Sequence, residues 1–303
     1  MSQGWSYIFG GFTEYVYKKT DANEDMKNYL SSYRYMPTFW LPIPWMKIFF
    51  RVLKKPRACR FELKEIILKD ESTIVAASYG PQNNSNGLLV VVPDMCESHE
   101  AWYCCEAAFH AAKNYGWRTV VFNQRGLAGA NQTGKNLFGW HLHDDLAEFI
   151  QKISKTDEKV FLIGFGLGGT YVQMYLAKRG EKQLDSLVQA GVAIGPIYQA
   201  DKTFLKCDKN SILLSKYLKR RKAVVQSWLA QPFASEILRK AGISAQKLAS
   251  VSYITEFDYR IVCPTAGFTY LDEYYKAICD PDLIHRSSTP SLWVSSRHDP
   301  AVE

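Results

Sequence analysis

The chain lacks the features that mark several large classes of protein. No apolar run is long enough to cross a bilayer, because the most apolar stretch, residues 36–50, is interrupted by Pro37, Pro42 and Pro44. There are no internal repeats, no low-complexity tracts and no nucleic-acid-binding motif. No signal peptide stands at the N-terminus. These absences predict an intracellular protein, soluble or peripheral to a membrane, with no nucleic acid among its partners.

The cysteine and glycine patterns exclude further kinds of site. The seven cysteines form no Cys-x-x-Cys pair and are spaced irregularly. Such spacing is typical of free thiols in a reducing compartment rather than of a disulfide framework or a zinc site. The chain also lacks the Gly-Lys-Ser/Thr of a phosphate-binding loop and the glycine spacing of a dinucleotide fold. We therefore expect no cofactor and no metal.

The composition is that of an ordinary globular protein. Of the 303 residues, 47% are hydrophobic, 14% aromatic and 22% charged, which suits one large α/β domain or a core with an inserted cap. The formal net charge is +7, and two stretches concentrate the basic side chains. Such stretches usually form solvated helix faces, and they also suit an anionic lipid surface or a protein partner. The first stretch contains Lys47, Arg51, Lys54, Lys55, Arg57 and Arg60, and the second contains Lys216, Lys219, Arg220, Arg221 and Lys222.

The order of the expected elements indicates the fold class. Residues 61–69 and 73–79 alternate or run apolar and predict an antiparallel hairpin. Strands and helices then alternate, which predicts a mostly parallel sheet with functional loops at the carboxyl ends of its strands. A long, mainly helical stretch, residues 197–285, would form a cap. The further strands are expected at 88–92, 118–122, 159–163, 187–194 and 291–295, and the core helices at 101–113, 143–153 and 170–178.

Gly166 is the most informative residue. It stands at the centre of a Gly-x-Gly-x-Gly turn, between an expected strand and an expected helix, where a hydrolase elbow carries Gly-x-Ser-x-Gly. Glycine has no side chain that can attack a carbonyl, although it adopts the positive φ of such a turn without strain. The pattern therefore predicts a hydrolase scaffold without its nucleophile. The alternative is an ordinary strand–helix connection in another α/β fold.

Several further motifs point to one family. The chain resembles the abhydrolase-domain lipases that include bacterial YheT and the plant embryogenesis-associated proteins. The resemblance implies the α/β-hydrolase fold, with an N-terminal antiparallel hairpin and a helical cap, and activity on lipid esters through serine, histidine and aspartate. It rests on residues 121–126 (Val-Phe-Asn-Gln-Arg-Gly), 164–169, 256–258 (Glu-Phe-Asp), 267–268 (Gly-Phe), 272–275 (Asp-Glu-Tyr-Tyr) and 36–40 (Met-Pro-Thr-Phe-Trp).

The resemblance places the triad positions on this sequence. The nucleophile position is Gly166 and the acid position is Asp299, after the last expected strand. The family's histidine belongs to a Gly-Gly-His further along, so the histidine, the last strand and the last helix are expected to be missing, and His298 precedes the acid. The expected parts are an aromatic-rich extension (1–57), a core (58–196), a cap (197–285) and the last core strand with the acid loop (286–303).

The oxyanion loop also departs from the family pattern. Relatives have Pro-Gly-x-x-Gly where this chain has Pro-Asp-Met-Cys-Glu at residues 93–97. The resemblance implies that Met95, Cys96 and Leu167 line the oxyanion hole and pocket. Asp94 and Glu97 would bring negative charge toward a site meant for an oxyanion.

Other residues offer alternative chemistry. Cys96 with His99 could form a relocated nucleophile, whose thiol pKa a nearby helix N-terminus would lower. The alternative is that Cys96 is a small apolar residue, and Ser98 is a weaker candidate. Arg125 is expected to be a structural turn residue rather than a substrate clamp. His141, His143, Asp144 and Asp145 suggest a metal site, or else an aspartate pair that caps the next helix.

Three functional hypotheses follow. The first is a catalytically degenerate hydrolase that serves as a binding or scaffold subunit, with a protein partner at the exposed edge strand 292–294 and an acyl or lipid ligand beneath the cap. The second is a lipid ester hydrolase of which this sequence is a truncated or variant form. The third is a peripheral membrane adaptor that uses the basic aromatic stretches.

Overall fold

The computed structural model describes residues 21–32, 58–83, 85–156, 158–182, 187–284, 286–296 and 299. The chain divides into two compact units, residues 1–56 and 57–303. In the first unit the described element is helix α1 (Asp21–Ser31). The aromatic stretch 36–50, the basic residues from Lys47 to Arg57, and His298 lie outside the described residues.

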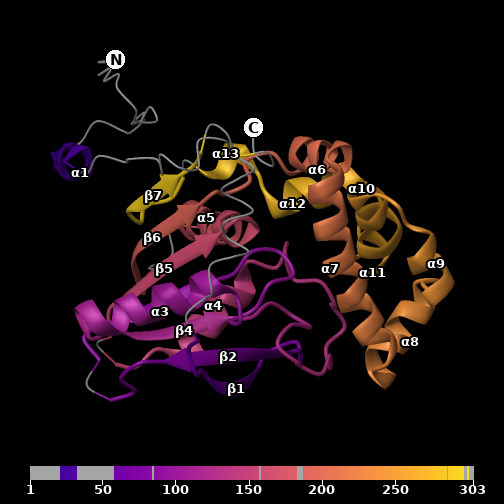
Figure 1. Cartoon of the computed structure of the whole chain (residues 1–303), viewed down its shortest axis with the longest axis horizontal. Coiled ribbons are helices and arrows are strands. Elements are labelled where there is room, and N and C mark those ends of the chain that lie inside the picture. The colour runs from indigo at the N-terminus through magenta and orange to yellow at the C-terminus, as the bar shows by residue number, and fades with distance from the viewer. Residues whose placement is uncertain are drawn as a thin grey trace. The chain divides into compact units, whose positions relative to one another are not determined.

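The second unit is built on a sheet of seven described strands in the order β1-β2-β4-β3-β5-β6-β7 (Figure 1). β1 pairs antiparallel with β2 and β2 with β4, whereas the remaining pairs are parallel. The predicted mostly parallel sheet with an antiparallel hairpin is therefore confirmed. The strands are β1 (Glu62–Ile67), β2 (Thr73–Tyr79), β3 (Leu88–Val92), β4 (Arg118–Phe122), β5 (Val160–Phe165), β6 (Val188–Ile194) and β7 (Ser291–Val294).

Helices cover both faces of the sheet, as a parallel sheet requires. Successive side chains of a strand point to opposite faces, so Val90 and Val92 enter one apolar cluster and Val91 enters the other. The larger cluster contains side chains of α4 (Asp144–Ile153) and α5 (Leu167–Glu181) together with much of the cap. The smaller cluster contains those of α3 (Trp102–Tyr115). The sheet is thus the middle layer between two buried cores.

The cap is a set of helices inserted between β6 and β7, and Figure 1 shows α6 to α11 gathered at one side of the sheet. Asn210 ends one helix and begins the next, because its side chain accepts hydrogen bonds from the N–H groups of Ile212 (3.1 Å) and Leu213 (3.2 Å). The elements are α6 (Ala200–Lys209), α7 (Ser211–Leu229), α8 (Pro232–Lys240), α9 (Ala245–Ser250), α10 (Ile254–Phe257), a π-helical turn η1 (Asp258–Val262), α11 (Cys263–Ala266), α12 (Leu271–Ile278) and α13 (Pro281–Ile284).

The basic stretch on α7 forms ion pairs within the fold at two of its positions. Arg221 is buried and forms an ion pair with Asp258, whose other carboxylate oxygen accepts a hydrogen bond from the Tyr275 hydroxyl (3.1 Å). The Arg221 guanidinium also lies 4.9 Å from the centroid of the Phe204 ring. Arg220 forms an ion pair with Glu97. The expectation of a solvated basic face is therefore wrong for Arg221, because the carboxylate of Asp258 pairs with its guanidinium inside the fold.

Among the residues that the structure describes, no helix combines the length and the apolar character that crossing a bilayer requires.

Candidate active site

A sharp turn joins β5 to α5. Its central residue, Gly166, has φ 54° and ψ −125°, a region that residues with a side chain rarely occupy. The neighbouring glycines permit close backbone approach, since a β-carbon at Gly164 would overlap the backbone of Gly168, and one at Gly168 would overlap the carbonyl groups of Val92 and Pro93. The strand, turn and helix that the sequence predicted are therefore present, in the geometry of a nucleophile elbow.

The loop after β3 brings Asp94 to this turn. Oδ1 of Asp94 accepts hydrogen bonds from the backbone N–H groups of Met95 (2.8 Å) and Leu167 (2.9 Å). In a hydrolase elbow, the oxyanion hole is made by the N–H of the residue after the nucleophile and by an N–H from the loop after the third strand. Met95 and Leu167, two of the three residues expected to line the oxyanion hole and pocket, follow β3 and Gly166 in the same way, and their N–H groups both bind the Asp94 carboxylate.

Gly166 and Asp94 occupy adjoining space. A β-carbon added at Gly166 would overlap Oδ1 and Cγ of Asp94 and would lie 3.0 Å from Oδ2. Contacts this short do not occur between real atoms, so a side chain at position 166 would force Asp94 to move. Within this arrangement, glycine is the residue that fits the elbow.

The sequence profile of the alpha/beta hydrolase fold matches residues 87–303. The chain belongs to this family. The resemblance that the motifs indicated is therefore confirmed. An abhydrolase domain-containing protein of Dictyostelium discoideum is 29% identical over 213 residues, or 67% of this chain and 51% of the relative.

Two further relatives lie within the groups that the motifs indicated. Monoacylglycerol lipase ABHD2 of Danio rerio is 25% identical over 259 residues, covering 82% of this chain and 61% of the relative. Embryogenesis-associated protein EMB8 of Picea glauca is 22% identical over 220 residues, covering 70% of this chain and 46% of the relative. The chain thus spans between 46% and 61% of the length of these relatives.

Burial dominates the electrostatics of Asp94 in this α/β-hydrolase. Burial raises the pKa of the Asp94 carboxyl, and the nearby Glu97 charge raises it further, while the N–H groups of Leu167 and Met95 act in the opposite direction. Tyr217 of α7 reaches toward Oδ2 at 3.5 Å, which is a weak contact. The carboxylate is thus held by the backbone N–H groups of Met95 and Leu167 in a partly buried site.

A second acid of the loop, Glu97, is bound elsewhere. Glu97 forms an ion pair with Arg220 of the cap and accepts a hydrogen bond from the Tyr103 hydroxyl (2.5 Å). The Tyr103 hydroxyl in turn accepts one from the backbone N–H of Asp94 (2.9 Å). Although burial acts to raise it, Tyr103 and Arg220 hold the pKa of Glu97 below its ordinary value. Sequence analysis missed Tyr103 and Tyr217, because only the fold brings α3, this loop and α7 together.

The structure does not support Cys96 as an activated thiol. Burial raises the thiol pKa of Cys96 to about 12, so the predicted lowering by a helix N-terminus is wrong. Oδ1 of Asn123 binds His99, accepting a hydrogen bond from its backbone N–H (2.8 Å) and lying 3.4 Å from its ring Nδ1.

Met95 of the same loop is buried, and its sulfur accepts a hydrogen bond from Nε of Arg221 (3.0 Å). The cap arginine therefore supports the oxyanion loop directly.

Arg125 is structural, as predicted. Its buried guanidinium binds both carboxylate oxygens of Asp145 (2.6 and 2.7 Å) and pairs with Asp70 (2.7 Å). The prediction that the aspartate pair caps α4 is wrong for Asp145, because its carboxylate binds Arg125 instead.

His143 binds the Lys178 ammonium through Nδ1 (2.9 Å). Within the described part of the chain, no three His, Cys, Asp or Glu side chains gather as a metal site.

The acid position lies at the same edge of the sheet as the elbow. A β-carbon built at Gly195, after β6, would lie 3.8 Å from Oδ2 of Asp299. The pKa of the Tyr217 hydroxyl is raised first by the Asp94 carboxylate and then by burial, and Asp299 adds a smaller contribution. Asp94 and Asp299 therefore both act on Tyr217 of the cap.

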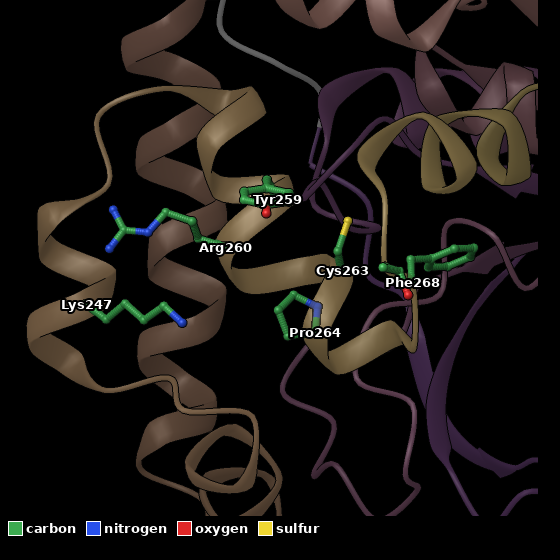
Figure 2. A pocket seen from close by; sticks show the side chains of 7 residues that line it. Lys247, Tyr259, Arg260, Cys263, Pro264 and Phe268 are labelled. Atoms are coloured by element: carbon green, nitrogen blue, oxygen red, sulfur yellow. The ribbon is translucent and has the colours of Figure 1, made fainter.

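Two cavities differ greatly in size. One of about 20 Å³ lies beside Cys96, under Trp228 and Phe138 of the buried core, and has room for about one water molecule. The other, of about 260 Å³, is a hollow on the cap remote from the elbow. Figure 2 shows Lys247 extending from α9 toward Pro264 on the other side of this hollow. The hollow is lined by Lys247, Tyr259, Arg260, Cys263, Pro264, Phe268 and Thr269.

Proposed function

We propose that this chain is a catalytically degenerate α/β-hydrolase that serves as a binding or scaffold subunit. The observation that carries the proposal is Gly166 at the position of the nucleophile. A catalytic triad works as a unit, and loss of its nucleophile alone removes nearly all of its rate advantage. The Asp94 carboxylate supports the same proposal, because it already accepts the hydrogen bonds of the Met95 and Leu167 N–H groups, which an ester oxyanion would need.

The neighbouring nucleophiles do not replace the missing serine. A thiol whose pKa is about 12 is almost wholly protonated at neutral pH, so Cys96 is a poor nucleophile. Ser98 lies in the loop before α3, and its carbonyl lies near the Cys104 thiol (3.8 Å). If the chain does act on a substrate, the lipase name of its relative ABHD2 favours a carboxylic ester.

The binding role has two candidate ligands. A protein partner would pair with β7, which is the edge strand of the described sheet and leaves Val294 exposed. A lipid or acyl ligand would not fit the water-sized cavity beside Cys96 unless the cap moved. The cap hollow has more room, and its Tyr259 and Phe268 walls with the Lys247 ammonium suit a small amphipathic anion. Peripheral membrane contact through the basic stretches is the weaker proposal, since Arg220 and Arg221 are engaged internally.

A fluorophosphonate probe and a short-chain ester test the proposal. The purified chain is expected to show neither labelling nor turnover, beside an active serine hydrolase as positive control. Labelling of the wild-type chain at a mapped residue, such as Cys96 or Ser98, would overturn the assignment and reveal a relocated nucleophile.

A further inference from the structure

The oxyanion donors of this chain are intact although the nucleophile is gone. The N–H groups of Met95 and Leu167 converge on one point, and Oδ1 of Asp94 occupies it at 2.8 and 2.9 Å. Donors in working oxyanion holes lie about 2.7–3.1 Å from the oxyanion. The Asp94 carboxylate oxygen therefore accepts hydrogen bonds from two N–H groups at the distances found in working oxyanion holes.

The two hydrogen-bond donors to this point come from two different elements. Leu167 is the first residue of α5, a helix of 15 residues, so the positive end of the helix dipole faces the carboxylate. Met95 belongs to a different element, the loop after β3, and supplies the second donor. An anion site made by one helix terminus and an independent loop, with a carboxylate bound in it, is more than a bare helix end.

Hydrogen bonds to Tyr103 also hold the loop after β3 in place, and this positions the Asp94 carboxylate at the two N–H donors. The backbone N–H of Asp94 donates to the Tyr103 hydroxyl (2.9 Å), which itself binds Glu97. Glu97 pairs with Arg220 of the cap. Glu97 is thus committed to other partners, and Asp94 is the loop acid that is available to the donors.

We propose that Asp94 is an intramolecular ligand of a retained oxyanion hole, a tethered carboxylate that closes the hole to other anions and fastens the loop after β3 to the elbow. The site's ligand class is accordingly a small monocarboxylate, for which the Asp94 side chain substitutes. The proposal does not depend on whether the chain hydrolyses esters. It concerns what the two backbone donors bind.

The test removes the carboxylate and offers acetate in its place. Asp94→Ala empties the hole, while Asp94→Asn keeps a side chain of the same shape with an oxygen that still accepts both hydrogen bonds. Amide resonances of Met95 and Leu167 in ¹⁵N-labelled protein are followed during acetate titration, with sodium chloride at equal ionic strength as the control. Asp94→Gly, the residue that the family pattern has here, is the second opening variant if the alanine variant folds poorly.

We expect saturable shifts of both amides with acetate in the opened variant, and none in the wild-type chain or in Asp94→Asn. Equal shifts in the wild-type chain would mean that Asp94 does not occupy the hole. A folded Asp94→Ala or Asp94→Gly variant whose two amides ignore acetate, or respond equally to chloride, would show that no carboxylate site exists. None of these outcomes depends on ester turnover, so the proposed function stands or falls separately.

Discussion

The carboxylate of Asp94 and the α-carbon of Gly166 pack so closely that no β-carbon fits between them. Asp94 comes from the loop after β3 and Gly166 from the turn after β5, two neighbouring strands of the sheet. The absence of a side chain at position 166 and the position of the Asp94 carboxylate are therefore parts of one steric arrangement.

This packing predicts that Gly166→Ala costs more stability than the backbone alone explains. Gly242 is the matched control, because it has φ +68° and a β-carbon there meets nothing within 4 Å. Gly242→Ala should cost about 1–2 kcal/mol for the left-handed conformation. Gly166→Ala should cost about 1–3 kcal/mol more, because its ψ of −125° lies outside the left-handed helical region and its β-carbon overlaps Asp94. Urea unfolding measures both values.

The excess cost should fall when Asp94 is shortened. In an Asp94→Gly background, Gly166→Ala should lose the part of its cost that comes from overpacking, which gives a non-zero coupling energy in a double-mutant cycle. Additive costs would mean that the two residues do not compete for space. The same steric argument predicts that Gly166→Ser alone gains no fluorophosphonate labelling while Asp94 is present.

The buried ion pair of Arg221 and Asp258 should be a major determinant of stability. Asp258→Asn leaves the Arg221 guanidinium buried without its counter-charge, and we expect a loss of about 3–5 kcal/mol in the free energy of unfolding. The exposed pair of Glu236 and Lys240 is the control, since Glu236→Gln should leave that free energy within experimental error. Similar losses for both pairs would contradict the assigned burial.

Acid should destabilise the fold through the half-buried His141. Burial lowers the pKa of His141 to about 4, with Arg125 and Lys178 adding to the effect. Because this folded-state pKa lies below the unfolded value of about 6.5, the unfolded chain binds the extra proton first. The stability is complete above about pH 6.5 and is lost as the pH falls toward 4.

His141→Phe should flatten this part of the stability profile, leaving the contribution of buried His143, whose pKa burial also lowers. Exposed His110→Gln is the control and should leave the slope unchanged. The measurement is the free energy of unfolding of the wild-type chain and both variants between pH 4 and 7. Parallel profiles for the wild-type chain and His141→Phe would show that His141 is not buried in its neutral form.

Cys96 should resist alkylation in the folded chain. A rise of the thiol pKa from 9.0 to about 12 reduces the thiolate fraction at pH 8 about a thousandfold. Peptide mapping after a short iodoacetamide pulse should find Cys96 nearly unmodified, whereas the urea-unfolded chain should be modified at all seven cysteines. Rapid native labelling of Cys96 would instead support the relocated nucleophile.

The cap hollow should bind a short fatty carboxylate. Its volume of about 260 Å³ and its aromatic walls suit hexanoate, and the Lys247 ammonium has no ion-pair partner within the described part of the chain. Lys247→Ala should weaken hexanoate binding about two- to fivefold, the range of a partly exposed charge pair. Lys240→Ala on α8 is the control. Calorimetry that finds no saturable hexanoate binding to the wild-type chain would remove this site.

Much of the fold was predictable because its signals are local. The hairpin and the strand before Gly164 follow from short apolar runs bounded by turn residues, and the observed limits differ from the expected ones by only a few positions. The elbow was predictable for the same reason, since its glycines are adjacent in sequence. Asp94 was recognised as a misplaced charge in the oxyanion loop.

What the sequence could not give depends on distant neighbours. The hydrogen bond from Leu167 to Asp94 joins residues 73 positions apart, and its existence depends on a rotamer and a loop path. The solvated face expected at Arg221 was wrong because its partner Asp258 stands 37 positions away. The thiol pKa of Cys96 was predicted in the wrong direction because burial outweighs the effect of a helix terminus.

The shared space of Asp94 and Gly166 also constrains which residues the two positions can hold together. A serine at position 166 would overlap the Asp94 carboxylate where it now lies. A serine side chain in the elbow therefore requires Asp94 to leave its present rotamer or to be replaced. The turn after β5 and the loop after β3 thus form one unit in which a substitution at one position changes what the other position tolerates.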